Sequence, residues 1–495
     1  MTELSKSEKE IYNLRKEKVE KLKDIDIDSF PTNFKNSTFI EDIKTKHQSL
    51  EDGDQTDISV LVRGRILSIR SFGKLTFIDI KDMTGKIQLL VAKDDLHENL
   101  QQYIELLDVG DVIGSRGNIM KTKKGELSLK ISELILLSKS FRALPEKWHG
   151  LKDKETRFRQ RYLDFIVNSN AKKTIDTRFK VLQLLREFMV TDGFIEVETP
   201  TLQPKAGGAI AKPFITHHNA MNIDMFLRIA PELYLKRLII GGYEKVFEVG
   251  KVFRNEGVDQ THSPEFTMME SYEAYTDVNG VMDMVERMCE HIFTQLNQSL
   301  NVEYAGKEAN FSFPWKRISM FDLVSNHFEI EIKCDSELKE IQSMLNKKHN
   351  IQVDAQSIGT LVYDLFENYI EDNIVNPTFV THYPKEVSPF ARESKKEKGV
   401  TERFELFAFG SELANGFSEL IDPFDQDERL KVQAKKKIQG DEEAHVEDKD
   451  YIEALEFGLP PTGGLGFGVD RFVMMLTNND SIREVIAFPH LKPEN

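Results

Sequence analysis

Five β-rich segments between residues 57 and 140 constrain the fold more than any other feature of this sequence. Hydrophobic and polar residues alternate in them with a period of two, and turns that contain glycine separate them. A helical stretch near residues 94–107 follows the third segment. Five strands with one helix between the third and the fourth are typical of an OB-fold barrel, which often binds single-stranded nucleic acid. We therefore expect an OB-fold domain at residues 57–145.

Residues 1–56 are expected to form a helical extension and a lead-in to this barrel. Lysine and arginine alternate with glutamate as far as about residue 24, and Ile11, Leu14, Val19 and Leu22 recur at near-helical spacing. The pattern predicts an exposed, solvated helix. A helix that helps to hold RNA is the alternative interpretation.

A second domain is predicted at residues 146–495. Pro145 and Gly150 punctuate the change of pattern, and the amphipathic segment TRFKVLQLLREFMVTDGF then predicts a helix that ends at Gly193. Strands such as FLRIA, KVFEVGKVFRN and EFTMMESYEAY alternate with helices after it, which is typical of an α+β domain with a mostly antiparallel sheet. The sequence contains neither a P-loop nor a GxGxxG turn, so a nucleotide site here needs another architecture.

Charge and cysteine content limit the functions that this chain can have. The 66 basic and 82 acidic residues give a net charge of −16, which opposes nucleic-acid binding by the whole surface but not by a local basic region. The acidic residues also suit magnesium and a cationic substrate. Cys289 and Cys334 show no metal-ligand spacing, so we expect no zinc site and no disulfide, with both thiols buried. Neither a secretory signal nor a membrane span is recognisable, and we expect a cytoplasmic protein without a membrane partner.

Three blocks of sequence in the second domain carry the chemistry. They are GFIEVETPTLQPKAGGAIAKPF at 193–214, FEVGKVFRNEGVDQTHSPEFTMMESYEAY at 247–275 and GLPPTGGLGFGVDRFVMMLTN at 458–478. Each is ambiguous alone, because an arginine at a strand end is usually solvated and glycines also mark close strand packing. Their order and separation, with FRNE, HSPEF and GxGxGxDR intact, resemble the three signature motifs of class II aminoacyl-tRNA synthetases.

Within that class the chain resembles the lysyl-tRNA synthetases of bacterial type over nearly its whole length. The stretches RIAPELYLKRLIIGG, THHNAMNIDMF, EVSPFAR and ELANGFSEL distinguish it from the aspartate and asparagine enzymes. The resemblance implies a class II catalytic domain, an antiparallel sheet flanked by helices, that activates L-lysine with ATP and transfers it to the 3′ end of lysine tRNA. It also implies a homodimer that forms through the first motif and the helix before it, around Phe188–Pro200.

The resemblance assigns the nucleotide and metal contacts to matching positions. Arg254 matches the arginine that bridges the α-phosphate and the amino-acid carboxylate, and Arg471 matches the one on the γ-phosphate; guanidinium groups bind such oxygens in pairs. Glu405 and Glu412 match the carboxylates that bind Mg²⁺, and a turn at Phe409–Gly410 could bring them together.

The resemblance also assigns contacts to adenosine. Phe266 matches the aromatic residue that stacks on adenine, and Glu256 and His262 match polar contacts to the nucleotide. The neighbouring Thr261 and Ser263 depart from the arginine and asparagine that are usual in the family.

Lysine binding is assigned to residues that would pair with its two ammonium groups and its carboxylate. Glu232 matches the residue on the α-amino group, Tyr272 and Glu419 match the pair on the ε-ammonium, and Asn415 lies on the carboxylate side with Arg254. Glu270 belongs to the same lysine-binding set. A buried glutamate that pairs with the ε-ammonium would reject uncharged amino acids strongly.

In the barrel, Phe77, Gln88 and Glu126 match the residues that recognise the central uridine of the anticodon. An unpaired base can stack on an aromatic ring while amide and carboxylate groups read its edge. Arg63, Arg65 and Arg70 either hold phosphates or are plain surface charges.

Three other functions remain open at this level. An aspartate or asparagine ligase is disfavoured by Tyr272 and Glu419. A synthetase-like protein that senses lysine or binds RNA without catalysis is suggested by Thr261 and Ser263. A relative that lysylates a protein instead of tRNA would lack the barrel predicted at 57–145.

Overall fold

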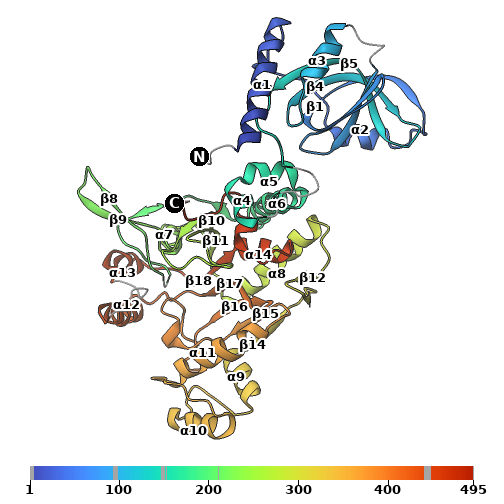
Figure 1. Cartoon of the computed structure of the whole chain (residues 1–495). Helices are drawn as coiled ribbons and strands as arrows, with labels where there is room; N and C mark the ends of the chain where they lie inside the picture. Colours follow the sequence, from blue (N-terminus) through green and yellow to red (C-terminus); the bar gives the residue numbers. More distant parts are fainter. Residues whose placement is uncertain are drawn as a thin grey trace. The chain divides into compact units, whose positions relative to one another are not determined.

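The computed structural model describes residues 5–92, 98–145, 151, 153–209, 211–439 and 447–493. The chain divides into two compact units, Met1–Lys152 and Asp153–Asn495 (Figure 1). The beginning of the helix predicted near 94–107, and Gly150 at the predicted change of pattern, lie outside the described residues. Each unit is described by itself below.

The first unit is built around a closed five-stranded barrel with the strand order β1-β2-β3-β5-β4. Neighbouring strands are antiparallel except β3 and β5, which are parallel. Because side chains alternate across a strand, the period-two pattern places residues such as Ile66, Ile78 and Leu89 inside the barrel, where they are fully buried. The expected OB-fold is confirmed. The elements of the barrel are β1 (Gln55–Phe72), β2 (Leu75–Lys81), β3 (Lys86–Ala92), α3 (Glu98–Leu106), β4 (Val112–Lys121) and β5 (Leu127–Ser138).

Two helices precede the barrel, α1 (Lys6–Asp24) and α2 (Ile40–Lys46). Ser5 and Glu8 form a capping box at the start of α1, which satisfies backbone N–H groups that would otherwise lack partners. The expectation of a solvated helix is wrong for one face of α1, where Arg15, Val19 and Leu22 are buried. Leu22 belongs to the barrel core, and Arg15 donates hydrogen bonds to three backbone carbonyl groups of the same unit.

The second unit contains an eight-stranded sheet with the order β14-β15-β16-β17-β18-β11-β10-β6. Its six central strands are antiparallel, and the outermost pairs β14–β15 and β10–β6 are parallel. The strands are β6 (Ile195–Glu196), β10 (Lys245–Phe253), β11 (Glu265–Ala274), β14 (Lys316–Ser319), β15 (Thr378–Thr381), β16 (Arg403–Ala408), β17 (Ser411–Ser418) and β18 (Thr462–Gly468).

Helices cover this sheet, as Figure 1 shows, and the predicted α+β class is confirmed. The largest core cluster joins α6 (Ser169–Thr191), α8 (Val278–Gln295) and α14 (Val469–Leu476) to the central strands. Two small sheets, β7-β9-β8 and β12-β13, complete the strands. The remaining elements are α4 (Lys154–Arg159), α5 (Arg161–Val167), β7 (Leu202–Gln203), β8 (Ile215–His218), β9 (Ile223–Leu227), α7 (Glu232–Ile240), β12 (Asn301–Tyr304), β13 (Lys307–Asn310), α9 (Met320–Phe328), α10 (Leu338–His349), α11 (Ile358–Tyr369), α12 (Pro423–Ile438), α13 (Lys449–Glu456) and α15 (Ile482–Val485).

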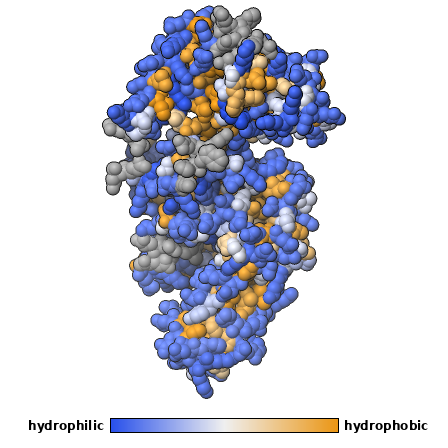
Figure 2. All heavy atoms as spheres, turned by 45° about the vertical axis from the view of Figure 1, so that its right-hand side comes forward, coloured by the Kyte–Doolittle hydropathy of each residue, from blue (hydrophilic) through white to orange (hydrophobic). Residues whose placement is uncertain are grey.

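The surface and the thiols can be compared with the sequence expectations. The face shown in Figure 2 is mostly hydrophilic, with hydrophobic side chains in separate patches. Among the helices of the described part of the chain, none is long and apolar enough to cross a bilayer. Both cysteines are free, and Cys289 is buried as expected, but Cys334 is only half-buried.

Candidate active site

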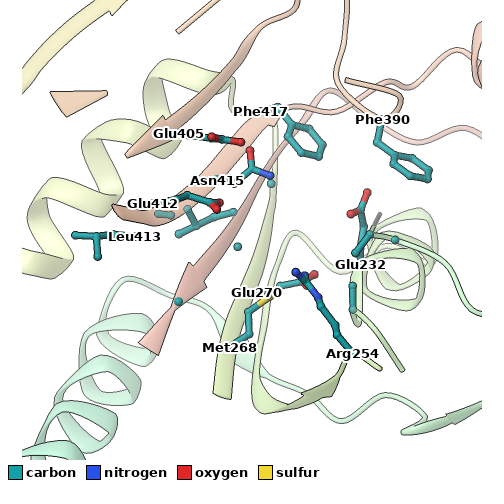
Figure 3. A pocket seen from close by; sticks show the side chains of 18 of the residues that line it. Glu232, Arg254, Met268, Glu270, Phe390, Glu405, Glu412, Leu413, Asn415 and Phe417 are labelled. Carbon is teal, nitrogen blue, oxygen red and sulfur yellow. The ribbon is translucent and has the colours of Figure 1, made fainter. Parts of the chain in front are cut away.

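A cavity of about 580 Å³ lies on the eight-stranded sheet and brings most of the predicted catalytic-domain residues together. In Figure 3 Glu405, Glu412 and Asn415 extend from one strand pair, while Arg254 and Glu270 lie on the other side and Glu232 lies beside Phe390. The predicted residues that line it are Glu232, Arg254, Glu256, His262, Phe266, Glu270, Tyr272, Glu405, Glu412, Asn415 and Arg471. Glu419 is the one predicted lysine-binding residue that does not line the cavity.

Arg254 follows directly after β10 and is held as a cation in the cavity wall. Its backbone N–H donates to the carbonyl of Pro264 at 2.9 Å, and its guanidinium lies 5.1 Å from the centre of the Phe266 ring. Burial lowers the pKa of Arg254 from its ordinary value, and nearby carboxylates oppose this effect. Its buried Nε has no hydrogen-bond partner among the described residues. The site therefore offers an unmet donor to an anionic group.

The loop between β10 and β11 carries the two departures from the family pattern, Thr261 and Ser263. The carboxylate of Asp259 accepts hydrogen bonds from the backbone N–H groups of Thr261 and His262 at 2.7 Å. Burial acts to raise the pKa of Asp259, but the hydrogen bonds from His262 and Thr261 outweigh it and hold the pKa below its usual range. The loop thus organises itself through Asp259 rather than through an arginine, and His262 stays at the cavity edge.

Arg471 stands at the start of α14, where the glycine-rich strand β18 ends. Its Nη1 donates to the backbone carbonyl of Glu412 at 2.9 Å and lies 3.5 Å from the carboxylate of the same residue. The adjacent Asp470 is buried, pairs with Arg178 and accepts the backbone N–H of Thr267 at 2.6 Å. The contacts of Asp470 connect the third motif to the second, so the backbone at Arg471 is held in place.

Glu405 and Glu412 lie on the two strands of one hairpin, β16–β17. The turn is made by Phe409 and Gly410, both with positive φ, of 54° and 71°, as its placement in the sequence predicted. Tyr383 donates its hydroxyl to Glu405 at 2.8 Å, and Arg403 forms an ion pair with the same carboxylate. Burial, with a further contribution from Glu412, raises the pKa of Glu405 to about 7 despite Arg403.

These carboxylates fit a hard cation such as Mg²⁺, which prefers oxygen ligands. Glu371 adds to the local negative charge, because burial and repulsion from Glu405 and neighbouring acids raise its pKa to about 7 as well. In the described ranges no group of three or more His, Cys, Asp or Glu side chains is arranged to hold a metal alone.

The other end of the cavity is acidic and aromatic. Glu232 is the first residue of α7, and Glu270 and Tyr272 lie two residues apart on β11, so they face the same side of the sheet. Tyr272 donates its hydroxyl to Glu270 at 3.2 Å. Burial and the nearby Glu232 raise the pKa of Glu270 well above its usual range. Asn415 is held from the opposite side by a 3.1 Å hydrogen bond from Arg403 to its Oδ1.

Glu419 lies directly behind the wall of this end. It is 1% exposed, and its Oε1 would be 2.0 Å from a Cβ atom at Gly464, which lines the cavity. Burial, with repulsion from Glu232, raises the pKa of Glu419 to about 8 although Lys236 opposes the change. Gly464 lines the cavity next to this carboxylate, and it leaves room for the carboxylate because it has no side chain.

The structure also brings in residues that the sequence reasoning did not single out. Lys236 is fully buried and pairs with both Glu232 and Glu419. Arg403 and Tyr383 hold Glu405, and Phe390 and Phe417 line the acidic end. The signals available were local: Lys236 follows Glu232 by one helical turn in APELYLKRL, and Arg403 precedes Glu405 by one strand period.

In the barrel, the predicted anticodon residues Phe77, Gln88 and Glu126 lie on β2, on β3 and just before β5. Gln88 is the cross-strand partner of Asp79 on β2 and of Ser128 on β5. Asp79 is two residues after Phe77, and Ser128 is two residues after Glu126. Gln88 is buried and accepts from the Ser128 hydroxyl at 3.2 Å, Phe77 is half-buried, and Glu126 is exposed. The three therefore occupy neighbouring positions of one sheet face.

The three barrel arginines differ in their contacts. Arg65 donates to the carbonyl of Gly110 at 2.7 Å, and the guanidinium of Arg63 lies 5.8 Å from the centre of the Phe39 ring. Arg70 is half-exposed and reaches Asp79 at 3.3 Å. Of the three, Arg65 has a clear role within the barrel itself, where it joins β1 to Gly110, two residues before β4.

Comparison with known proteins places both units. Residues 153–492 match the family model for tRNA synthetases class II (D, K and N), and residues 60–137 match the model for an OB-fold nucleic acid binding domain. The chain is 46% identical over 490 residues to the lysine–tRNA ligase of Thermoanaerobacter sp. (strain X514), covering 98% of this chain and 97% of that protein. It is 47% identical over 485 residues to the lysine–tRNA ligase of Listeria innocua serovar 6a, covering 97% of each. It is also 46% identical over 497 residues to the lysine–tRNA ligase of Prochlorococcus marinus (strain MIT 9215), covering 98% of this chain and 97% of that protein.

Proposed function

The chain belongs to the class II tRNA synthetases of the D, K and N group, and from this premise we propose that it activates L-lysine with ATP and transfers the lysyl group to the 3′ end of lysine tRNA. The observation that carries the choice of lysine is the acidic end of the cavity, where Glu232, Glu270 and Tyr272 lie in front of Glu419. An ammonium side chain is the natural occupant of such a field, and a substrate carboxylate would be repelled from it.

Activation brings two anions together, because the lysine carboxylate attacks the α-phosphorus of ATP. The residues must therefore neutralise charge and hold the reacting atoms in line more than they must move protons. Arg254, with its unmet buried donor, is placed to bridge the α-phosphate and the attacking carboxylate. Phe266, beneath that guanidinium, offers a face for the adenine ring, and Glu256 and His262 supply polar contacts.

The pyrophosphate end of ATP is assigned to the opposite side of the cavity. Arg471, fixed against the carbonyl of Glu412, would bind the γ-phosphate. Glu405 and Glu412 would hold Mg²⁺, which when bound neutralises the phosphate oxygens of the departing pyrophosphate. Tyr383 and Arg403 keep Glu405 oriented towards the cavity.

Lysine recognition follows from the three carboxylates and the two arms of the substrate. Glu232 would take the α-ammonium group, and Asn415 with Arg254 would receive the carboxylate. Tyr272 and Glu419 would take the ε-ammonium, with Glu270 completing the acidic wall. To bind its substrate side chain, an aspartate or asparagine ligase would need a protein cation or a neutral donor where this site has Glu419. Glu419 is neither, because its side chain is a carboxylic acid.

The barrel is assigned to tRNA. Phe77 would stack on the central base of the anticodon, and Gln88 and Glu126 would read its edge. We also propose three parts, 1–56, 57–145 and 146–495, a cytoplasmic location, and a homodimer around Phe188–Pro200. The exposed hydrophobic residues Phe179, Val190 and Ile195 at this part of α6 and β6 support a protein contact there.

Amino-acid-dependent ATP–pyrophosphate exchange by the purified chain tests the function. Exchange should depend on L-lysine and should stay at background with L-aspartate or L-asparagine. Exchange driven equally well by one of these two would refute the lysine assignment. Charging of lysine tRNA then separates an enzyme from a lysine-sensing protein, since the latter would form no lysyl-tRNA at saturating ATP, lysine and tRNA.

A further inference from the structure

Lys236 is an ammonium group buried inside the wall of the acidic end. It lies on α7 one turn after Glu232, its side chain is 0% exposed, and it does not line the cavity. Its Nζ is 2.5 Å from Glu232 Oε1 and forms a second ion pair with Oε2 of Glu419. A fully buried lysine is costly unless carboxylates compensate it, and here it has two.

Aromatic rings enclose the same ammonium. Its Nζ lies 5.0 Å from the centre of the Phe390 ring, 5.5 Å from Phe417, 5.8 Å from Tyr272 and 6.0 Å from Tyr451. The ring faces stabilise a cation at such distances. Burial acts to lower the pKa of Lys236, but Glu232 and Glu419 outweigh it and raise the pKa above its usual value. The side chain is therefore held as a cation by its surroundings.

The geometry of Glu419 shows what this cation does for the cavity. Lys236 forms its ion pair with Oε2 of Glu419, whereas Oε1 is the oxygen next to Gly464. Glu232 and Glu419 share this one internal ammonium, and the pairing leaves Oε1 of Glu419 next to Gly464, which lines the cavity.

We propose that Lys236 is a positioning residue that pairs with Glu419 and orients it, and thereby sets the selectivity of the cavity for a substrate that carries a side-chain ammonium. This inference rests on the proposed lysine activation. Glu232 and Lys236 face Glu419 from α7, Tyr272 from β11 and Tyr451 from α13, and Lys236 is the cation among them.

Lysine-dependent ATP–pyrophosphate exchange by the full-length chain between pH 6.5 and 9.5 provides the test, with Lys236→Met compared with the wild type. In the wild type, kcat/KM for lysine should rise with pH to a break near the Glu419 pKa of about 8. In Lys236→Met the carboxyl loses its cation, so the break should move up by about one unit, which corresponds to about a tenfold loss near neutral pH. The loss should lie in KM more than in kcat. The ratio of kcat/KM for lysine to that for norleucine should also fall.

Lys139→Met is the matched control. Lys139 is likewise 0% exposed and pairs with two carboxylates, those of Asp108 and Asp111, but it belongs to the barrel unit. This variant should lower the melting temperature and leave the pH break of exchange where it was. Lys236→Arg, which keeps the charge, should bring the break back towards the wild-type value.

The outcomes separate the inference from the proposed function. Absence of lysine-dependent exchange in the wild type would overturn the function itself. A folded Lys236→Met that keeps the wild-type pH break and selectivity would overturn the role of Lys236 alone. If Lys236→Met does not fold, Lys236→Gln and Lys236→Arg decide, because equal pH profiles for the neutral and the charged variant would contradict the inference.

Discussion

Arg254 is the side chain whose surroundings define its role most sharply. Its guanidinium lies over an aromatic ring and interacts electrostatically with several carboxylates. Its buried Nε has no hydrogen-bond partner in the described part of the chain. Arg254→Ala should lower kcat for lysine activation by about 10²–10³-fold, since it removes a cation from the developing charge. The variant should still fold, with a lower melting temperature, because the buried carboxyl group of Glu270 loses a neighbouring cation.

Pyrophosphate exchange and thermal unfolding measure the two halves of that expectation. Arg254→Lys is the informative companion, since it keeps a charge but loses the fork that binds two oxygens at once. An intermediate rate for this variant would indicate that both charge and geometry contribute. A near-wild-type rate for Arg254→Ala would exclude the assigned role.

Gly464 shows how the lack of a side chain shapes the lysine end. A Cβ atom there would lie 2.0 Å from Glu419 Oε1 and 2.7 Å from the Tyr272 ring. Gly464→Ala should therefore raise KM for lysine by at least about tenfold while KM for ATP changes less, since displacement of a charged contact commonly costs that much. Gly466→Ala is the control for folding, because its Cβ would meet no protein atom closer than 3.8 Å. Equal thermal destabilisation by both variants would argue against a specific effect at Glu419.

Individual residues of the motifs could be predicted because each motif is a short run of neighbouring residues in the sequence. A strand that ends in arginine, or a glycine strand that runs into a helix, is visible in a few neighbouring letters. Lys236 escaped prediction because its second partner, Glu419, is far away in the sequence and only the fold brings the two together. The burial of Glu419 behind Gly464 is equally non-local, and so is the contact of Tyr383 with Glu405.

At the scale of elements, the hairpin β16–β17 turns two distant carboxylates into one site. The positive φ angles at Phe409 and Gly410 close the turn, and Arg403 and Tyr383 hold Glu405 on the cavity side. Protons and Mg²⁺ compete for such a carboxylate, because only its ionised form binds the metal. With the pKa of Glu405 raised to about 7, the Mg²⁺ concentration that gives half-maximal exchange should rise as the pH falls below 7.

Exchange rates measured against Mg²⁺ concentration between pH 6 and 8 test this prediction. Glu371→Gln removes a neighbouring negative charge, so the carboxyl of Glu405 should lose its proton more easily and the whole dependence should shift to lower pH. Glu405→Gln should need more Mg²⁺ at every pH. A Mg²⁺ requirement that is the same at pH 6 and pH 8 in the wild type would contradict the assignment of Glu405.

The types of most elements were predictable, because periods of two and 3.6 residues reflect which side chains face a core. The β-barrel and the helix that ends before Gly193 follow from this periodicity. The buried face of α1 did not, because Arg15 and Val19 meet partners that lie far away in the chain. Residues 276–375 gave few signals, although α9, α10 and α11 there share a core cluster with β15 and β16, since several short elements build that core jointly.

At the scale of the whole molecule, the two units divide the proposed reaction. The cavity on the eight-stranded sheet is lined by the residues to which we assign the formation of lysyl-adenylate, whereas the predicted base-reading residues belong to the barrel. The net charge of −16 is compatible with tRNA binding only if contacts are local, because a uniformly acidic surface repels phosphate. The first step should therefore be independent of the barrel, and the second should depend on it.

Glu126→Ala tests this division with the least disturbance to the fold. Glu126 is exposed, and its hydrogen bonds to described residues are made by its backbone: its N–H donates to the Thr122 hydroxyl, and its carbonyl accepts from the Ser128 hydroxyl and the Thr122 N–H. The variant should lower kcat/KM for lysine tRNA by about tenfold, as expected for the loss of one base-edge contact of about 1–3 kcal/mol. Lysine-dependent exchange should stay at the wild-type rate. Asp57→Ala, another exposed acid on the barrel, should leave both steps unchanged. Equal loss of exchange and charging in Glu126→Ala would show instead that the substitution disturbs the catalytic unit, and the assignment of the barrel to the anticodon would lose its support.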